Sequence, residues 1–152
     1  MTQPSGGAAG SVWSTQPKVT VQDANGNTVT GAINSITLTI TSAGGATLTC
    51  TANPKSASSG VDTFAGCKIN KAGTYTLTAA ASGLTSAVSS NFIITAGSAA
   101  SIDVNAGNNQ SATAGSTVAT LPSVIVKDSN GNPVSGAAVT FAVAPGGGSI
   151  TG

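Results

Sequence analysis

The chain contains no histidine, no arginine and no glutamate, and only 6% of its 152 residues are charged. No side chain is therefore present that titrates near neutral pH, and no glutamate can pair with an aspartate for acid–base catalysis. Five lysines and five aromatic residues do not supply a basic, base-stacking surface for nucleic acid. We expect a protein that is not an enzyme, uses no cofactor and binds no nucleic acid.

Long apolar runs are also missing. No stretch approaches the ~20 residues needed to cross a bilayer, so we expect no membrane insertion in this segment. The opening residues Met1–Gly6 have neither the basic start nor the apolar centre of a signal peptide. We expect any export signal or anchor to lie outside this sequence, and whether Met1 is native stays open.

Metal ligands are equally scarce. Two cysteines without a histidine cannot complete a zinc site. The segments Asp23–Asn27 and Asp128–Asn132 superficially suggest calcium loops, but an EF-hand loop places glycine sixth and ends in a bidentate glutamate. Here the glycine is fourth, and we predict hairpin turns without a metal.

What the chain does have is a repeat. Val19–Ala32 returns as Val124–Ala137 at an offset of 105 residues, with nine of fourteen positions identical. The match continues upstream, where Ala9–Ser11 corresponds to Ala114–Ser116. Self-similarity at a fixed period indicates one structural unit used in tandem, and here the period has the size of a domain.

The repeat predicts two units. Unit one spans residues 1–96 with a full strand set of its own, residues 97–100 form a short linker, and unit two spans residues 101–152. Unit two lacks a counterpart of residues 50–95, so it is the first half of a domain. A half-domain of this size buries too little surface to fold alone. We expect its apolar face to be covered by a neighbouring copy or by a native continuation of the chain.

The apolar residues alternate with polar ones almost everywhere, which predicts an all-β chain. Ile36, Leu38 and Ile40 alternate with threonines, and Tyr75 and Leu77 do the same. In unit two the pattern predicts strands at Ile102 and Val104, at Val124 and Val126, and over Val139–Val143, the last with an unpaired edge. Turn signals every 8 to 12 residues or so are typical of a sandwich.

Two pairs of turn residues stand out. Asn25–Gly26 and Asn130–Gly131 are strong hairpin dipeptides, because both residues tolerate positive φ in a type I′ turn. We predict that these residues serve folding and not binding. A further signal is Gly73 two residues before Tyr75, which suggests a tyrosine corner, although an ordinary half-buried strand tyrosine would fit as well.

Cys50 and Cys67 are the only thiols. In a secreted β-domain they would form a disulfide, and in a reducing compartment they would be two buried thiols. We favour the disulfide.

Several of these motifs together resemble the bacterial immunoglobulin-like repeats of the invasin and intimin type. The residues that carry the resemblance are Val-x-Val-x-Asp-x-Asn-Gly-Asn-x-Val in both units, Ala-Gly-Thr-Tyr-Thr-Leu-Thr from Ala72, and Pro122. Unit one, with Leu48–Thr51 and Phe64–Ile69, resembles a two-cysteine variant of very large surface proteins. The resemblance implies tandem immunoglobulin-like β-sandwiches at the cell surface, the second incomplete.

Three functions remain in view. The first is a structural spacer in an extracellular adhesin stalk or fibre, whose partners are neighbouring repeats or copies of the same protein. The second is a glycan- or protein-binding module, with Trp13 and Tyr75 as a sugar-stacking platform. The third is a subunit of a self-assembling fibre or virion appendage, completed by strands from a neighbouring chain. A lysine–asparagine crosslink between Lys18 and Asn91 would also suit a stalk.

Overall fold

A computed structural model describes residues 1–145, which form strands and turns and contain no helix. The predicted all-β class is thus confirmed, and the alternation of threonine with apolar residues places the apolar side chains on one face. The thirteen strands are β1 (Gly7–Ala8), β2 (Lys18–Thr20), β3 (Ser35–Ile40), β4 (Leu48–Thr49), β5 (Lys55–Ser56), β6 (Val61–Thr63), β7 (Lys68–Ile69), β8 (Gly73–Tyr75), β9 (Leu77–Ala80), β10 (Ala87–Val88), β11 (Phe92–Thr95), β12 (Ala99–Ala106) and β13 (Ser123–Asp128).

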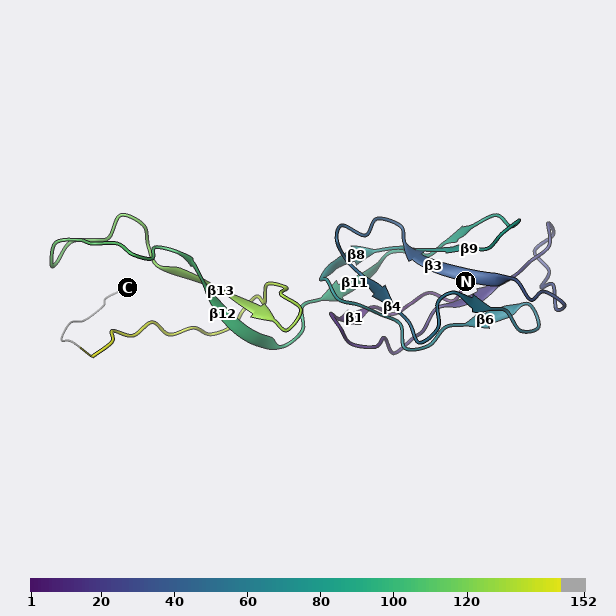
Figure 1. Ribbon diagram of the computed structural model, residues 1–152, viewed down its shortest axis with the longest axis horizontal. Helices are drawn as coiled ribbons and strands as arrows, with labels where there is room; N and C mark the ends of the chain where they lie inside the picture. Colours follow the sequence, from purple (N-terminus) through teal and green to yellow (C-terminus); the bar gives the residue numbers. More distant parts are fainter. Residues whose placement is uncertain (146–152) are drawn as a thin grey trace.

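The strands form several small sheets. The largest has the order β10-β9-β3-β5, and a second has the order β1-β11-β8, in which β1 runs parallel to β11. Three antiparallel pairs, β2-β6, β4-β7 and β12-β13, complete the set. The first eleven strands belong to unit one, and β12 and β13 belong to unit two, which lies beyond one end of unit one (Figure 1).

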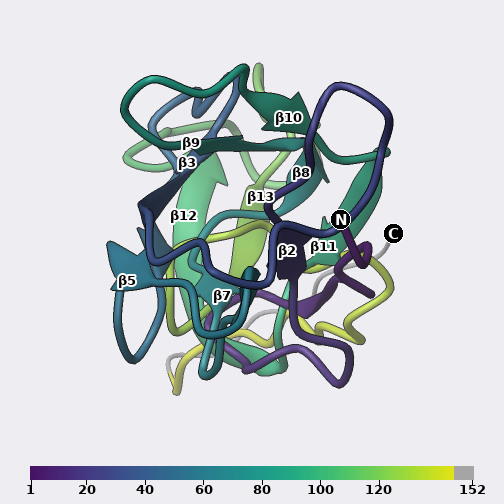
Figure 2. The same cartoon turned by 90° about the vertical axis from the view of Figure 1, so that its right-hand side faces the viewer.

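All buried apolar side chains of the described residues lie in unit one. They form one cluster around Phe64, Leu38 and Ile69, with Trp13 packed edge-on against Phe92 at a centroid distance of 5.1 Å. The end-on view in Figure 2 looks at unit one from the side away from unit two, with β12 and β13 behind it. Unit one therefore has a closed core that does not depend on unit two.

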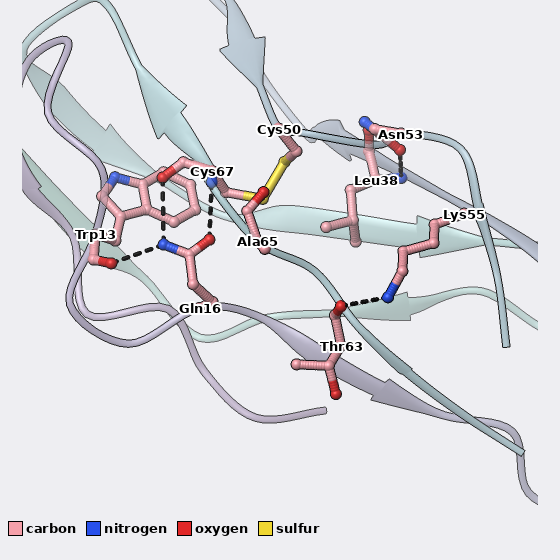
Figure 3. Close-up of a disulfide and its surroundings, with 9 residues drawn as sticks. All are labelled: Trp13, Gln16, Leu38, Cys50, Asn53, Lys55, Thr63, Ala65 and Cys67. Atoms are coloured by element: carbon pink, nitrogen blue, oxygen red, sulfur yellow. Dashed lines mark hydrogen bonds between the residues drawn. A yellow bond between two sulfur atoms is a disulfide. The ribbon is translucent and has the colours of Figure 1, made fainter. Parts of the chain in front are cut away.

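The predicted disulfide is present in this core. Cys50 follows β4 and Cys67 precedes β7, so the bond joins the two strands at one end of this antiparallel pair. Gln16 holds the adjoining chain, since its Nε2 donates to the Trp13 carbonyl at 2.7 Å and its Oε1 accepts from the Cys67 N–H at 2.8 Å (Figure 3). No pattern in the sequence singled out this glutamine.

Unit two has no such core. Among its described residues only Asp128 and Asn132 are buried, while Ile102, Val104 and Phe141 expose about half or more of their surface. The expected strand over Val139–Val143 is wrong, because these residues have no strand partner within the described part of the chain. In unit one the corresponding strand β3 is held between β5 and β9, and the described part of unit two has no counterpart of either.

The linker is shorter than expected. Strand β11 ends at Thr95 and β12 begins at Ala99, so only residues 96–98 join the units, and Ala99 and Ala100 belong to β12. The chain thus passes almost directly from one strand into the next.

One strand edge differs between the two units. In unit two, β13 pairs with β12 along its outer edge. In unit one the equivalent strand β2 pairs with β6 on its inner edge, and on the outer edge a single bridge joins Thr2 to Lys18. The described residues of unit one therefore supply no counterpart of β12 on this edge.

The two repeated turns are not of type I′. Gly26 and Gly131 have φ of 85° and 82°, but neither asparagine before them has positive φ. The Gly26 N–H donates to the Asp23 carbonyl and closes a turn over Asp23–Gly26, and Gly26 itself is left-handed. This is the pattern of a three-residue hairpin loop with a G1 bulge. The physical reason is the aspartate, whose carboxylate binds the backbone ahead of it and fixes the asparagine at negative φ.

Candidate functional site at the joint between the units

The turn of unit two is organised by Asp128, the last residue of β13. Its Oδ1 accepts hydrogen bonds from the N–H groups of Asn130 and Asn132, both at 2.8 Å. The side-chain amide of Asn132 donates to Oδ2 at 2.9 Å. This network holds the Asn132 side chain in one orientation.

In that orientation Asn132 binds unit one. Its Nδ2 donates to the Asn70 carbonyl at 3.0 Å, and its Oδ1 accepts from the Ala72 N–H at 2.9 Å. These two atoms belong to the connection between β7 and β8, whose backbone groups are not used in a strand pair there. One asparagine amide therefore satisfies a donor and an acceptor of the neighbouring unit at once.

Two further hydrogen bonds secure the joint. The Asn130 Nδ2 donates to the Ala9 carbonyl at 3.3 Å, and the Gly97 N–H in the linker donates to Asp128 Oδ2 at 2.8 Å. The linker and the end of unit one are thus bound to the same turn. Four hydrogen bonds therefore join the turn to the β7–β8 connection, to Ala9 and to the linker, and together they set the position of unit two on unit one.

The carboxyl of Asp128 is strongly favoured in its ionised form. Burial raises its pKa, but hydrogen bonds from the Asn132 side chain and from the N–H groups of Gly97, Asn132 and Asn130 outweigh that effect and lower the pKa from 3.8 to about 2. In unit one the same kind of hydrogen bonds, chiefly from the Asn27 side chain, lower the pKa of the exposed Asp23.

A shallow polar cleft of about 330 Å³ lies beside the joint. Its walls come from both units, and no aromatic side chain is among them. The lining residues are Ala9, Gly10, Ser11, Thr47, Thr49, Lys68, Asn70, Ser129 and Asn130. The cleft offers hydrogen-bonding groups and one cation to anything that enters.

The two aromatic residues considered for sugar stacking lie elsewhere and are both buried. Trp13 is 2% exposed and Tyr75 is 8% exposed, and each packs on Phe92. A surface platform made of Trp13 and Tyr75 is therefore wrong. The Tyr75 hydroxyl lies over Gly73, burial raises its pKa, and within residues 1–145 it makes no hydrogen bond of the kind that defines a tyrosine corner.

Titratable groups are scattered in the part of the chain that the structure describes. No three aspartate or cysteine side chains meet there as a metal cluster would require. Asp62 is buried, and Lys55 Nζ lies 2.9 Å from its Oδ1. The two side chains form an ion pair, but the angles at these atoms are not those of a hydrogen bond. Residues 1–145 contain no helix with the length and hydropathy of a membrane span.

Comparison with known proteins adds no relative. No family model matches the chain, and neither the curated proteins nor the solved structures include one similar enough to count as a match.

The sequence located the turns at Asn25–Gly26 and Asn130–Gly131 but indicated a role in folding alone. It did not reveal that Asn132 and Asp128 bind the neighbouring unit. The final asparagine is the same in both copies, but this repetition gave no separate signal, because its amide also binds the aspartate of its own turn.

Proposed function

We propose that this chain is a non-catalytic spacer of an extracellular bacterial surface protein, built from tandem immunoglobulin-like β-sandwiches. The observation that carries the proposal is the joint, in which Asp128 and Asn132 of the repeated turn are buried and Asn132 binds the end of unit one. A spacer must keep its units at a fixed separation, and a hydrogen-bonded joint after a three-residue linker does so.

Two further features support an extracellular stalk or fibre. A disulfide closes a 17-residue separation inside unit one, and such bonds persist in oxidising compartments. The residues that the repeat preserves are turn and core residues, and the chain has no histidine or glutamate for catalysis. Neighbouring units of the same protein are the partners that this design needs.

The test is the distance between the two units in solution. Spin labels attached through Ser86→Cys and Thr117→Cys, both exposed, report the distance by pulsed electron resonance, and the native cysteines do not react because they are bonded. A spacer with a fixed joint gives one narrow distance distribution, which Asn132→Ala broadens. A broad distribution in the unaltered chain would contradict a spacer of fixed length.

A second candidate, a module that binds glycan or protein, is favoured by one observation, the polar cleft beside the joint. Screening on a glycan array separates the two functions. Saturable binding that Lys68→Ala abolishes, with the interspin distance unchanged, would favour the binding module.

A further inference from the structure

The outer edge of β2 carries unused backbone hydrogen-bonding groups. Along a strand, successive residues direct these groups to opposite sides. The Val21 N–H donates toward β6, at the Gly60 carbonyl, whereas Lys18 exchanges hydrogen bonds with Thr2 on the other side. Thr20 and Gln22 therefore face the same side as Lys18, where the described residues supply no strand beyond Thr2.

The repeat shows what occupies this edge elsewhere. At the offset of 105 residues, Thr20 and Gln22 correspond to Ile125 and Lys127 of β13. Those two residues stand opposite Asp103 and Ser101 of β12 in an antiparallel pair. The edge that is covered in unit two is thus open in unit one.

A groove of about 440 Å³ runs along the open edge. β2 and the start of the following turn form one wall, and β9 and β10 form the other, with Leu84 between them. In unit two, Ile102 lies opposite Val126 and Val104 lies opposite Val124. The counterparts of these two valines in unit one, Val21 and Val19, are buried in its core. Directly opposed residues share a face, so a strand like β12 would direct its apolar side chains toward the Ile36 and Ala79 wall of the groove.

The turn at the end of this edge has the same internal hydrogen bonds as the turn of unit two. Asp23 Oδ1 accepts from the N–H groups of Asn25 and Asn27, and the Asn27 amide donates to Asp23 Oδ2, as in the joint of unit two. Yet every residue from Gln22 to Thr30 is exposed. The turn is at the end of unit one away from unit two (Figure 1).

We propose that the open edge of β2, its groove and the turn over residues 22–28 form a docking surface for a preceding unit of the same repeat. Its connecting strand would have the pattern of β12, and Asn27 would bind the end of that unit as Asn132 binds Asn70 and Ala72. The proposal rests on the spacer function above. A strand joined to Met1 would reach Thr20 and Gln22 directly, since Thr2 already lies on that edge.

The first experiment adds only the strand. A copy of residues 98–105 is placed before Met1, which reproduces the repeat spacing, and amide exchange is followed by nuclear magnetic resonance. The N–H groups of Thr20 and Gln22 are expected to exchange more than about tenfold more slowly than in the unextended chain. A control extension carries Ser101→Pro and Asp103→Pro in the copied strand. Proline at these positions removes the N–H groups that would bind β2 and prevents the strand from pairing, so the protection should be lost. Unchanged exchange with the intact extension would overturn the proposal.

The second experiment adds a whole unit. A copy of residues 1–105 precedes Met1 and alone carries the isotope label. The Ala72 and Gly97 N–H groups of the added copy are expected to be as protected as those of the existing joint. Asn27→Ala in the following unit should accelerate Ala72 exchange in the added copy, as Asn132→Ala should accelerate Ala72 exchange at the existing joint.

The outcomes separate the two proposals. If the added copy's Ala72 and Gly97 amides are unprotected while the existing joint stays protected, the docking surface is refuted and the spacer function stands. If the existing joint is itself unprotected, the spacer function fails. If the longer chain does not fold, the protection of Thr20 and Gln22 in the chain with the short extension still decides whether the docking surface exists.

Discussion

The turns at Asp23–Asn27 and Asp128–Asn132 have nearly the same sequence and the same internal hydrogen bonds, but different surroundings. In unit two, Asp128 and Asn132 are buried at 3% and 5% exposure, whereas the corresponding residues of unit one are exposed. The local sequence therefore determines the shape of the turn, and the neighbour determines its burial. The opposite contrast holds for the apolar core, since every buried apolar side chain of the described residues lies in unit one, whereas Ile102, Val104 and Phe141 of unit two are exposed.

Removal of a large side chain tests that contrast most strongly. Phe64 is fully buried in unit one, whereas Phe141 of unit two is 49% exposed. Phe64→Ala should lower the free energy of unfolding by about 3–5 kcal/mol, and Phe141→Ala by less than about 0.5 kcal/mol. Urea unfolding followed by the fluorescence of Trp13, the only tryptophan, measures the first change, and amide exchange in β12 and β13 measures the second. An equal cost for Phe141 would mean that another surface covers unit two.

The disulfide should have the next largest effect, and it acts on unit one alone. Reduction should lower the free energy of unfolding by about 3 kcal/mol, because the bond restricts the unfolded chain. The same unfolding assay with and without reductant measures the change. Thiol titration of the denatured, unreduced protein should find no free cysteine, and two free thiols in material from an oxidising compartment would contradict the bond.

The turns themselves give a smaller effect. Gly26 has φ of 85°, and no atom lies within 4 Å of the position that a Cβ would take, so Gly26→Val adds backbone strain without a clash. The expected cost in free energy of unfolding is about 1–2 kcal/mol, and Gly26→Asn should cost less because asparagine tolerates this region. Calcium should not shift the melting temperature. A calcium-dependent rise that Asp23→Ala abolishes would instead indicate a metal site.

Acid perturbs the joint and leaves the apolar core of unit one unaffected. The pKa of Asp128 is lowered to about 2 in the folded chain from 3.8, so ionisation stabilises the joint. This contribution is complete above the ordinary pKa and is lost as the pH falls from about 4 through 2. The chemical shift of the Gly97 amide should follow this titration, with a midpoint near 2. Asp128→Asn should remove the transition, and a midpoint near 4 would contradict the hydrogen-bonded carboxylate.

The features that the sequence predicted are those encoded locally. Alternating threonine and apolar residues were enough for β3 and β9, and the pairing of Cys50 with Cys67 followed from their number and the class of protein. The location of both turns was also correct. The turn type was wrong because the Asp23 carboxylate, and not the asparagine–glycine pair, controls the backbone there.

The features that the sequence did not predict depend on residues far apart in the chain. Val139–Val143 has the pattern of a strand, but a strand forms only where partners exist. The role of Asn132 depends on Asn70 and Ala72, which lie 60 or more residues away. The open edge of β2 became visible only when its register was compared with that of β13.

Every group of unit one and the linker that binds the turn is a main-chain atom: the carbonyls of Ala9 and Asn70, and the N–H groups of Ala72 and Gly97. Except at Gly10 and Gly97, where a Cβ would lie 2.8 Å from Asn130 Nδ2 and 3.3 Å from Asp128 Oδ2, side chains on this surface can therefore change while the backbone path and the joint remain. The units of such an array would be interchangeable, since a unit that carries the turn could bind any unit that presents these main-chain groups in the same arrangement. A gene encoding them could gain or lose whole units, and the length of the protein would change by fixed steps without a new interface having to evolve.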